Sequence, residues 1–461
     1  MHPTPAQRRP WSLDPVMMMV GALVVAIALT WLIPSGRFER TAGGLVRPGT
    51  YQIVPKEHSP AALLPSAQDH RQVYPASPAA IVTAIPAGME RAAGLIFMII
   101  ALGGMFGVLR ATGTVEAAME HLVNLTGARL GVLTAVLMVA ISAGGSFLGL
   151  ISQYLVIIPL FMALSKRLGL EPMFGFALVT VAAKIGYLAS VANPVVLVVA
   201  QPIAGVPVFS GLLFRLVLWV VMLALGIGYV LRLTRVVAAP AASGDGAPLS
   251  GRQISIIAVL GAAVVLLIYG AAQWHWTEAE FSAVYLALSA AIAVLGRIAP
   301  GRAAHHLVDG MKSMMLAGLL VGMAKAVEII LLEGQILDTI VHALAAAAQG
   351  LPPVLVGLAL VFIEIVLGLL IPSGSAKAAL SMPILVPIGQ MAGVSGQATV
   401  LAYLMGNGLV NMVAPTSGML LAYLATADIS FGRWFRFVLP LMVVLLVVAL
   451  AAVALAVLVG Y

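Results

Sequence analysis

Two pairs of short sequences decide the fold of this chain. Gly144-Gly145-Ser146 is followed by Ser190-Val191-Ala192-Asn193-Pro194, and Ser373-Gly374-Ser375 is followed by Asn411-Met412-Val413-Ala414-Pro415-Thr416-Ser417. Each pair places two clusters of small, polar, helix-breaking residues inside long apolar segments. Irregular backbone cannot face lipid, because its N–H and C=O groups would lack hydrogen-bond partners. It persists at membrane depth where it lines a cavity walled by protein, which in transporters is where substrates and ions bind.

The composition places the chain among polytopic membrane proteins before any motif is considered. Of its 461 residues, 62% are hydrophobic and only 9% are charged, whereas a soluble domain carries roughly 25% charged residues. The chain has a net charge of +7, and its Lys and Arg residues lie mostly at the ends of apolar segments. This placement therefore indicates membrane topology and not nucleic-acid binding. The chain has no cysteine, which excludes disulfides, thiolate metal sites and cysteine nucleophiles.

Spans of about 20 apolar residues, together with the positions of Arg and Lys, predict the first half of the topology. Residues 1–84 are interpreted as a retained first helix (16–33), not a signal peptide, and an extracytoplasmic loop. Repeat 1 covers residues 85–235. Its predicted parts are a span at 92–109, an amphipathic arm at 115–125 with Glu116, Glu120 and His121 on its polar side, a hairpin at 130–166, a broken helix at 172–200 and a span at 212–231.

The second half repeats this order. Residues 236–304 form a cytoplasmic linker and two connecting spans, 254–272 and 281–295. Repeat 2 covers residues 305–461. Its predicted parts are a span at 313–332, an arm at 336–344, a hairpin at 352–392, a broken helix at 397–425 and a final span at 437–458. The hairpins are expected to turn at Gly144–Ser146, from the cytoplasmic side, and at Pro372–Ser375, from the outside.

The two repeats are predicted to be inverted relative to each other. Gly88-Met89-Glu90 aligns with Gly310-Met311-Lys312 at an offset of 222 (310 − 88). Five spans lie between corresponding points, and an odd number of crossings reverses the orientation. The second arm has no Lys or Arg, as an external segment should. The prediction is an all-α polytopic membrane protein with an inverted-repeat ion-transporter fold, about nine spans, two re-entrant hairpins and two broken helices.

The sequence resembles a known transporter family. The run from Ile371 to Pro383, IPSGSAKAALSMP, looks like the second hairpin of the YfcC-like branch of the anaerobic dicarboxylate carrier (DcuC-type) family. Three further runs strengthen the likeness, which extends from about residue 14 to the end: NMVAPTSG at 411–418, WFRFVLP at 434–440 and WLIPSGRF at 31–38. The resemblance implies membership of the wider ion transporter superfamily, carriage of small anions by an elevator motion, and a homodimer. It also implies acidic residues just after the first hairpin tip, where this chain has Phe147-Leu148-Gly149-Leu150.

The four clusters are expected to meet near the membrane midplane. Interrupted helices present N–H groups to an anion at one end and C=O groups to a cation at the other, and hydroxyl and amide side chains add further partners. The alternative is that the small residues only let helices pack closely. The candidate substrate- or ion-binding residues are Gly144, Gly145, Ser146, Ser190, Asn193, Pro194, Ser373, Gly374, Ser375, Lys377, Asn407, Asn411, Pro415, Thr416 and Ser417.

Charged residues inside apolar segments are candidates for substrate or coupling roles. Lys184 is expected either to face a substrate carboxylate, to stand in for a bound cation, or to extend toward the cytoplasmic face. Lys377 is a candidate anion contact, and Glu364 is a candidate proton carrier. Lys325 and Glu328 lie three residues apart on one span, where a structural ion pair is expected. No His, Asp or Glu spacing indicates a metal site.

These features predict a secondary transporter in a bacterial inner membrane, without a cofactor. The expected solute carries a carboxylate, such as a dicarboxylate, a short-chain fatty acid or an amino acid. Transport is expected to be coupled to a proton or a sodium ion, or to run as an exchange. A channel-like facilitator of small anions is the alternative. An intramembrane enzyme ranks last, because the serines have no His or Asp partner at a convincing spacing.

Overall fold

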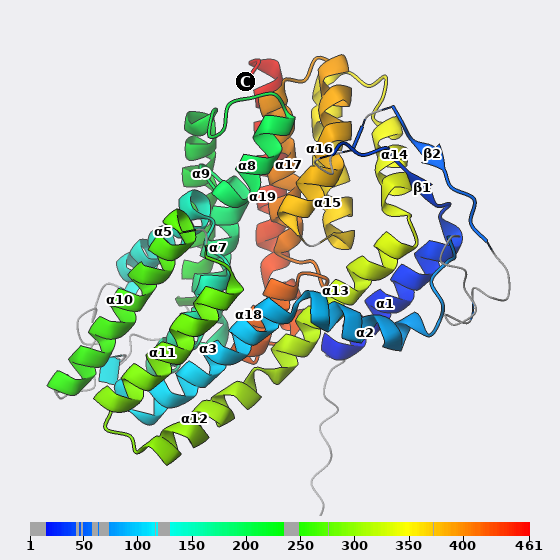
Figure 1. Ribbon diagram of the computed structural model, residues 1–461. Helices are drawn as coiled ribbons and strands as arrows, with labels where there is room; N and C mark the ends of the chain where they lie inside the picture. The colour runs from blue at the N-terminus through cyan, green and yellow to red at the C-terminus, as the bar shows by residue number, and fades with distance from the viewer. Residues whose placement is uncertain are drawn as a thin grey trace, which may run out of the picture.

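The computed structural model describes residues 15–42, 46–47, 49–57, 63, 73–115, 117–118, 130–234, 249–274, 276–371 and 373–461. Over these ranges the chain is almost entirely helical (Figure 1), and eight helical segments are long and apolar enough to cross a membrane. Within the same ranges the only sheet is an antiparallel pair of two-residue strands, β1 (Gly36–Arg37) and β2 (Gln52–Ile53). The predicted all-α polytopic fold class is confirmed.

The first half contains the predicted hairpin and broken helix. After α1 (Pro15–Leu32), its elements are α2 (Ala80–Arg91), α3 (Ala93–Ala111), the hairpin of α5 (Leu130–Leu148), the 3₁₀ helix η3 (Ser152–Val156) and α6 (Ile158–Arg167), the broken helix of α7 (Pro172–Ala189) and α8 (Pro194–Ile203), and α9 (Leu212–Leu231) with the short η4 (Arg232–Thr234). Two connecting helices follow, α10 (Gly251–Gln273) and α11 (Glu278–Leu295).

The second half repeats these elements at a nearly constant offset. They are α12 (Pro300–Ser313), α13 (Met315–Glu333), the arm α14 (Leu337–Ala347), the hairpin of α15 (Pro353–Leu370) and α16 (Gly374–Met391), the broken helix of α17 (Gly396–Asn411) and α18 (Gly418–Ala427), and α19 (Phe431–Leu458). The starts of α3 and α13 differ by 222 (315 − 93), those of α5 and α15 by 223 (353 − 130), and those of α8 and α18 by 224 (418 − 194).

The helices of the two repeats pack reciprocally. In the part of the molecule that Figure 1 shows at the bottom, α3 packs on α12 and α2 packs on α13. In the centre, α6 of the first hairpin packs on α18, and α16 of the second hairpin packs on α8. The first halves of the two broken helices, α7 and α17, pack on each other. Each contact has a counterpart in which the repeats are exchanged, as an inverted repeat with a pseudo-two-fold axis requires.

The two helix breaks are set by local backbone preferences. Ser190 ends α7 in the left-handed region with a φ of 41°. The Asn193 side chain then accepts the Val195 N–H as the N-cap of α8, and Pro194 occupies the first turn, where its missing N–H costs nothing. Ser417 caps α18 in the same way. The predicted breaks at 190–194 and 411–417 are therefore built by capping chemistry.

The predicted tip of the first hairpin is wrong by about one helical turn. Gly144, Gly145 and Ser146 lie inside α5, and the chain turns at 149–151, where Gly149 has a φ of +69°. A Cβ at Gly144 would lie 2.2 Å from the Tyr154 hydroxyl, so this glycine allows the hairpin legs to approach closely. The glycine pair marks helix packing, and Gly149 marks the turn.

Other elements were missed or lie outside the described residues. The helices α2 and α12 were not predicted, and the loop after α1 contains the β1–β2 pair, which lies beside α14 (Figure 1, upper right). Arg40 pairs with Asp338 of α14 at 3.0 Å, which anchors this loop to the second repeat. Most of the predicted arm at 115–125, with Glu116, Glu120 and His121, lies outside the described residues, as does Pro372 of the second hairpin tip.

The crossing of α3 and α12 requires glycine on both helices. A Cβ at Gly310 would lie 2.2 Å from the Gly103 carbonyl oxygen. We expect Gly310→Ala to lower the free energy of unfolding by about 1–3 kcal/mol, through overpacking. Gly261→Ala in α10 is the matched control, because nothing lies within 4 Å of its Cβ position, and it should be neutral or stabilising by up to about 1 kcal/mol. Thermal unfolding of both variants in detergent tests this contrast, and equal melting temperatures would contradict it.

Candidate functional site

The end of α5 is hydrogen-bonded directly to the break between α7 and α8. The Ser146 hydroxyl accepts the Val191 N–H at 3.0 Å, and the Ser146 carbonyl accepts the Ala192 N–H, also at 3.0 Å. In return, Asn193 Nδ2 donates to the Gly145 carbonyl at 3.2 Å. The first two predicted clusters therefore lie together, and the unpaired groups of the break are satisfied from the hairpin.

The second hairpin and the second break are joined in the same manner. Thr416 Oγ1 donates to the Leu369 carbonyl near the end of α15 at 2.8 Å. Within the break, Ser417 Oγ donates to Asn411 Oδ1 at 3.3 Å, and Asn411 Nδ2 donates to the Asn407 carbonyl at 3.1 Å. Ser373 caps the first turn of α16. These side chains are held by one another, so their geometry is set before a ligand binds.

One carbonyl in each break is covered by a side chain from the following long helix. Arg215 of α9 is 1% exposed, and its Nε and Nη2 donate to the Val191 carbonyl at 3.2 and 3.0 Å. Trp434 of α19 donates from Nε1 to the Met412 carbonyl at 2.9 Å. These two positions differ by 219 (434 − 215), close to the repeat offset. The two repeats therefore satisfy a carbonyl in the helix break with different side-chain donors.

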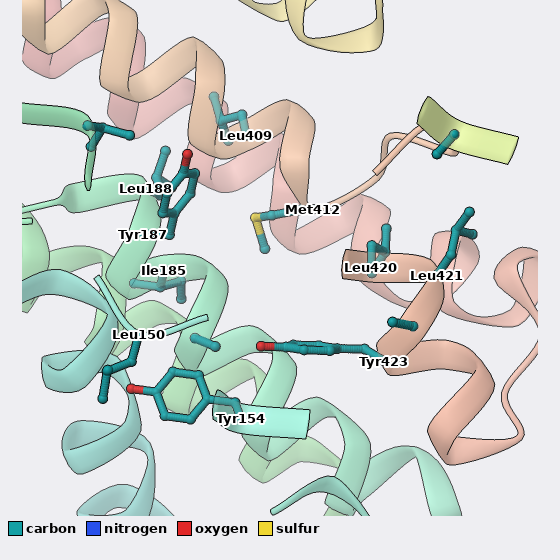
Figure 2. Close-up of a cluster of buried hydrophobic side chains, with 14 of the residues drawn as sticks. Leu150, Tyr154, Ile185, Tyr187, Leu188, Leu409, Met412, Leu420, Leu421 and Tyr423 are labelled. Atoms are coloured by element: carbon teal, nitrogen blue, oxygen red, sulfur yellow. The ribbon is translucent and has the colours of Figure 1, made fainter. Parts of the chain in front are cut away.

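Tyrosines join the two repeats at the centre. Asn407 Nδ2 of α17 donates to the Tyr187 hydroxyl of α7 at 3.0 Å, and Tyr403 donates to the Gly374 carbonyl at the second hairpin tip at 2.7 Å. Tyr423 of α18 donates to the Ile151 carbonyl at the first hairpin tip. Figure 2 shows Tyr423 reaching across from α18 toward the side on which Tyr154 lies. The first hairpin tip is thus held by a helix of the opposite repeat, and the second tip is held by a helix of its own repeat.

A buried ion pair lies between the legs of the second hairpin. Lys377 Nζ is 3.2 Å from Glu364 Oε2 and donates to the Glu364 carbonyl at 2.9 Å, and both side chains are fully buried. Ser381 donates to Glu364 Oε1 at 2.7 Å. The proposed anion contact and the proposed proton carrier therefore neutralise each other. In the first hairpin the equivalent contact is uncharged, because the Tyr154 hydroxyl donates to the Ile141 carbonyl at 2.5 Å.

The other charged candidates divide into a paired and an unpaired group. Lys325 and Glu328 form the ion pair that their spacing predicts, at 2.8 Å. Lys184 is only 3% exposed, so it does not extend to a membrane surface. Its ammonium lies 5.9 Å from the centre of the Tyr423 ring, which is a cation–π contact. No ion pair links it to an acidic side chain among the described residues.

Three of the remaining candidates, Ser375, Pro415 and Gly374, lie at the second hairpin tip and in the second break. Ser375 lies in the first turn of α16 and Pro415 lies in the second break, and both are partly buried. Gly374 is a close-contact position, since its Cβ would lie 2.2 Å from the Tyr187 hydroxyl. No group of three His, Cys, Asp or Glu side chains that could hold a metal ion is found over the described ranges.

Sequence reasoning missed the central tyrosines, Arg215 and Trp434. A signal for the tyrosines existed, because Tyr in the middle of an apolar span departs from its usual place at the membrane interface. The offset of the repeat also pairs Tyr154 with Lys377 (377 − 154 = 223) and Arg215 with Trp434, although these residues share no chemistry that a search for similarity would detect.

Comparison with known proteins identifies the family. Residues 14–458 match the C4-dicarboxylate anaerobic carrier family, DcuC. YfcC of Escherichia coli, which is provisionally described as a basic amino acid antiporter, is 28% identical over 80% of this chain and 78% of its own length. An uncharacterized protein of Haemophilus influenzae is 25% identical over 94% of both chains.

Two solved transporter structures are similar to this chain. The YdaH transporter of Alcanivorax borkumensis has a TM-score of 0.45 and 18% identity, and the comparison covers 97% of this chain and 99% of YdaH. MtrF of Neisseria gonorrhoeae, described as an antimetabolite efflux pump, has a TM-score of 0.43 and 17% identity over 97% of this chain and 95% of MtrF.

The ion pair in the second hairpin gives a test of its structural role. Lys377→Met leaves the Glu364 carboxylate buried without its partner, which costs about 3–5 kcal/mol. The double variant Glu364→Gln/Lys377→Met removes both charges and should recover most of that loss. Melting temperatures of the two variants and the wild type measure the difference. A double variant no more stable than Lys377→Met would contradict the assignment.

Proposed function

Because the chain belongs to the C4-dicarboxylate anaerobic carrier family, we propose that it is a secondary active carrier of a small carboxylate-bearing solute. Its place in a family of multi-pass membrane transporters, and not of enzymes, follows from the family match and from the apolar helices. The solute class, the coupling and the motion described below are our proposals. They are supported by one observation: both hairpin tips and both helix breaks lie together around α7 and α17.

The proposed site uses the polar groups at this convergence. Ser375 and Ser417 offer hydroxyls, and Asn407 and Asn411 offer amides. Glycine at position 374 lets the second tip approach the Tyr187 hydroxyl closely. A carboxylate accepts hydrogen bonds from such donors and from the N–H groups at the starts of α16 and α18. A carboxylate-bearing solute such as a dicarboxylate, a short-chain fatty acid or an amino acid suits this donor set.

Alternating access is supported by the reciprocal contacts of the two repeats. The first hairpin packs on α18 through α6, and the second hairpin packs on α8 through α16. An inverted repeat allows these two contacts to exchange roles, so that one side of the site opens while the other stays closed. We propose an elevator motion of the hairpins and broken helices, coupled to a proton or a sodium ion or running as an exchange, in a homodimer of the bacterial inner membrane.

A channel-like facilitator of small anions is the second candidate. Hairpins that dip into the membrane also occur in channels, and this chain has two hairpins. The two functions differ in kinetics, because a carrier saturates and exchanges labelled for unlabelled solute across the membrane, whereas a pore does not require exchange. Uptake into proteoliposomes with the unlabelled solute inside separates them, and a rate linear in solute concentration without counterflow would favour the channel.

Single alanine substitutions test the site itself. We expect Ser375→Ala and Asn411→Ala to lower carboxylate uptake by roughly ten- to hundredfold at subsaturating solute, since hydrogen bonds to a charged group are worth about 1.5–3 kcal/mol. Ser255→Ala is the control, because that exposed side chain only donates to the Gly251 carbonyl of its own helix. Uptake of radiolabelled succinate and propionate is measured for each. Unchanged uptake in a correctly folded variant would remove that residue from the site.

A further inference from the structure

The charges buried in the described part of the protein are almost all matched. Glu364 pairs with Lys377 at 3.2 Å, and Glu328 pairs with Lys325 at 2.8 Å. On the side of the outer loop, Asp338 pairs with Arg40 at 3.0 Å. Thus each carboxylate that is buried in this part of the chain already has a cationic partner. Each of these pairs is electrically neutral, so none offers a net negative charge to a positively charged group of a solute.

Lys184 is one of two exceptions on the cationic side. It lies in the second half of α7, a helix that is buried from Met173 to Ala189, and its ammonium lies 5.9 Å from the centre of the Tyr423 ring. Arg215 is also buried without a carboxylate, but it donates to the Val191 carbonyl and to the Tyr461 hydroxyl. A buried ammonium with no counter-charge is strongly disfavoured, so the group either loses its proton or receives a counter-charge from outside the chain.

A cavity lies where η3 and α18 meet α3 and α12, at the end of the molecule that the Lys and Arg pattern assigns to the cytoplasm. It has a volume of about 220 Å³ and is lined by Arg110, Leu155, His306, Asp309, Met314 and Thr426, among others. Asp309 is already paired with Lys312 at 3.0 Å. Arg110 and His306 therefore give this cavity a basic character, which favours an anion as its occupant.

Two residues of the cavity wall belong to the elements that lie next to the Tyr423 contact. Thr426, which lines the cavity, lies one helical turn beyond Tyr423 on α18, and Leu155 lies on η3 just after the first hairpin tip. The hydrogen bond from Tyr423 to the Ile151 carbonyl joins the same two elements. Tyr423 thus connects two elements of the cavity wall, and its ring also lies 5.9 Å from the ammonium of Lys184.

We propose that Lys184 is the fixed counter-charge for the carboxylate of a net-anionic solute, which reaches it from the Arg110–His306 cavity when the contact between Tyr423 and Ile151 opens. This inference rests on the proposed carrier function and narrows its solute class. Dicarboxylates and short-chain monocarboxylates fit it. Basic amino acids do not, because their side-chain cation would meet Lys184 and would find no unpaired carboxylate among the described buried residues.

The test uses full-length protein in proteoliposomes and in detergent, with propionate, succinate and L-arginine as probes. For Lys184→Met we expect carboxylate uptake at subsaturating solute to fall roughly ten- to hundredfold, together with loss of the thermal stabilisation that the carboxylate produces. The melting temperature of the ligand-free variant should equal or exceed that of the wild type, since no counter-charge is orphaned. Lys184→Arg should retain part of the uptake, and exposed Lys166→Met should behave as wild type.

The outcomes separate this inference from the carrier proposal. Wild-type protein that neither transports nor is stabilised by any carboxylate would overturn both. Carboxylate transport that persists at an unchanged KM in Lys184→Met would overturn the role of Lys184 and leave the carrier function standing. A lower melting temperature of ligand-free Lys184→Met would assign the lysine a structural role instead. Saturable uptake of L-arginine by the wild type would contradict the predicted charge of the solute.

Discussion

A helix that is interrupted inside a bilayer exposes main-chain N–H and C=O groups that water cannot satisfy. Each requires a partner supplied by the protein, and this requirement organises the centre of the molecule. In the first repeat the partners are Ser146, Asn193 and Arg215. In the second they are Thr416 and Trp434. The positions of the hairpins follow from these hydrogen bonds, because the hairpin ends donate or accept them. Arg215 of the long helix α9 and Trp434 of the long helix α19 donate to the remaining carbonyls.

The two repeats share geometry while their chemistry has diverged. A tyrosine hydroxyl joins the legs of the first hairpin, whereas a lysine paired with Glu364 joins the legs of the second. A guanidinium covers one break and an indole covers the other. In each case the acceptor, a backbone carbonyl, is preserved and only the donor differs. Backbone geometry is fixed by the fold, so any side chain with a donor of suitable reach can fill the position.

The sequence was sufficient to predict most of the architecture. Apolar length determined the spans, and the clusters at 190–194 and 411–417 determined the helix breaks, because capping residues and prolines act locally. The tip of the first hairpin was misplaced, since helical glycines that permit close packing and a glycine that permits a turn look alike in sequence. The contacts of Tyr187, Tyr403 and Tyr423 could not be predicted, because they depend on how distant helices pack. Likewise, only the structure shows that Lys377 faces Glu364.

Charge balance links this architecture to the choice of solute. A protein interior of low polarity penalises an unmatched charge, so a site whose fixed charges already balance offers nothing to a charged ligand beyond hydrogen bonds. The second repeat is balanced in this sense by Lys377 and Glu364. The first repeat has Lys184 without an acidic partner among the described residues, and it has Phe147 and Leu148 where the family resemblance implies acids. The asymmetry of charge between the repeats thus favours an anion on the side of the first hairpin. The likeness to YfcC establishes kinship without deciding the charge of the solute, because kinship reflects the shared backbone, whereas the charge of the solute depends on these few side chains.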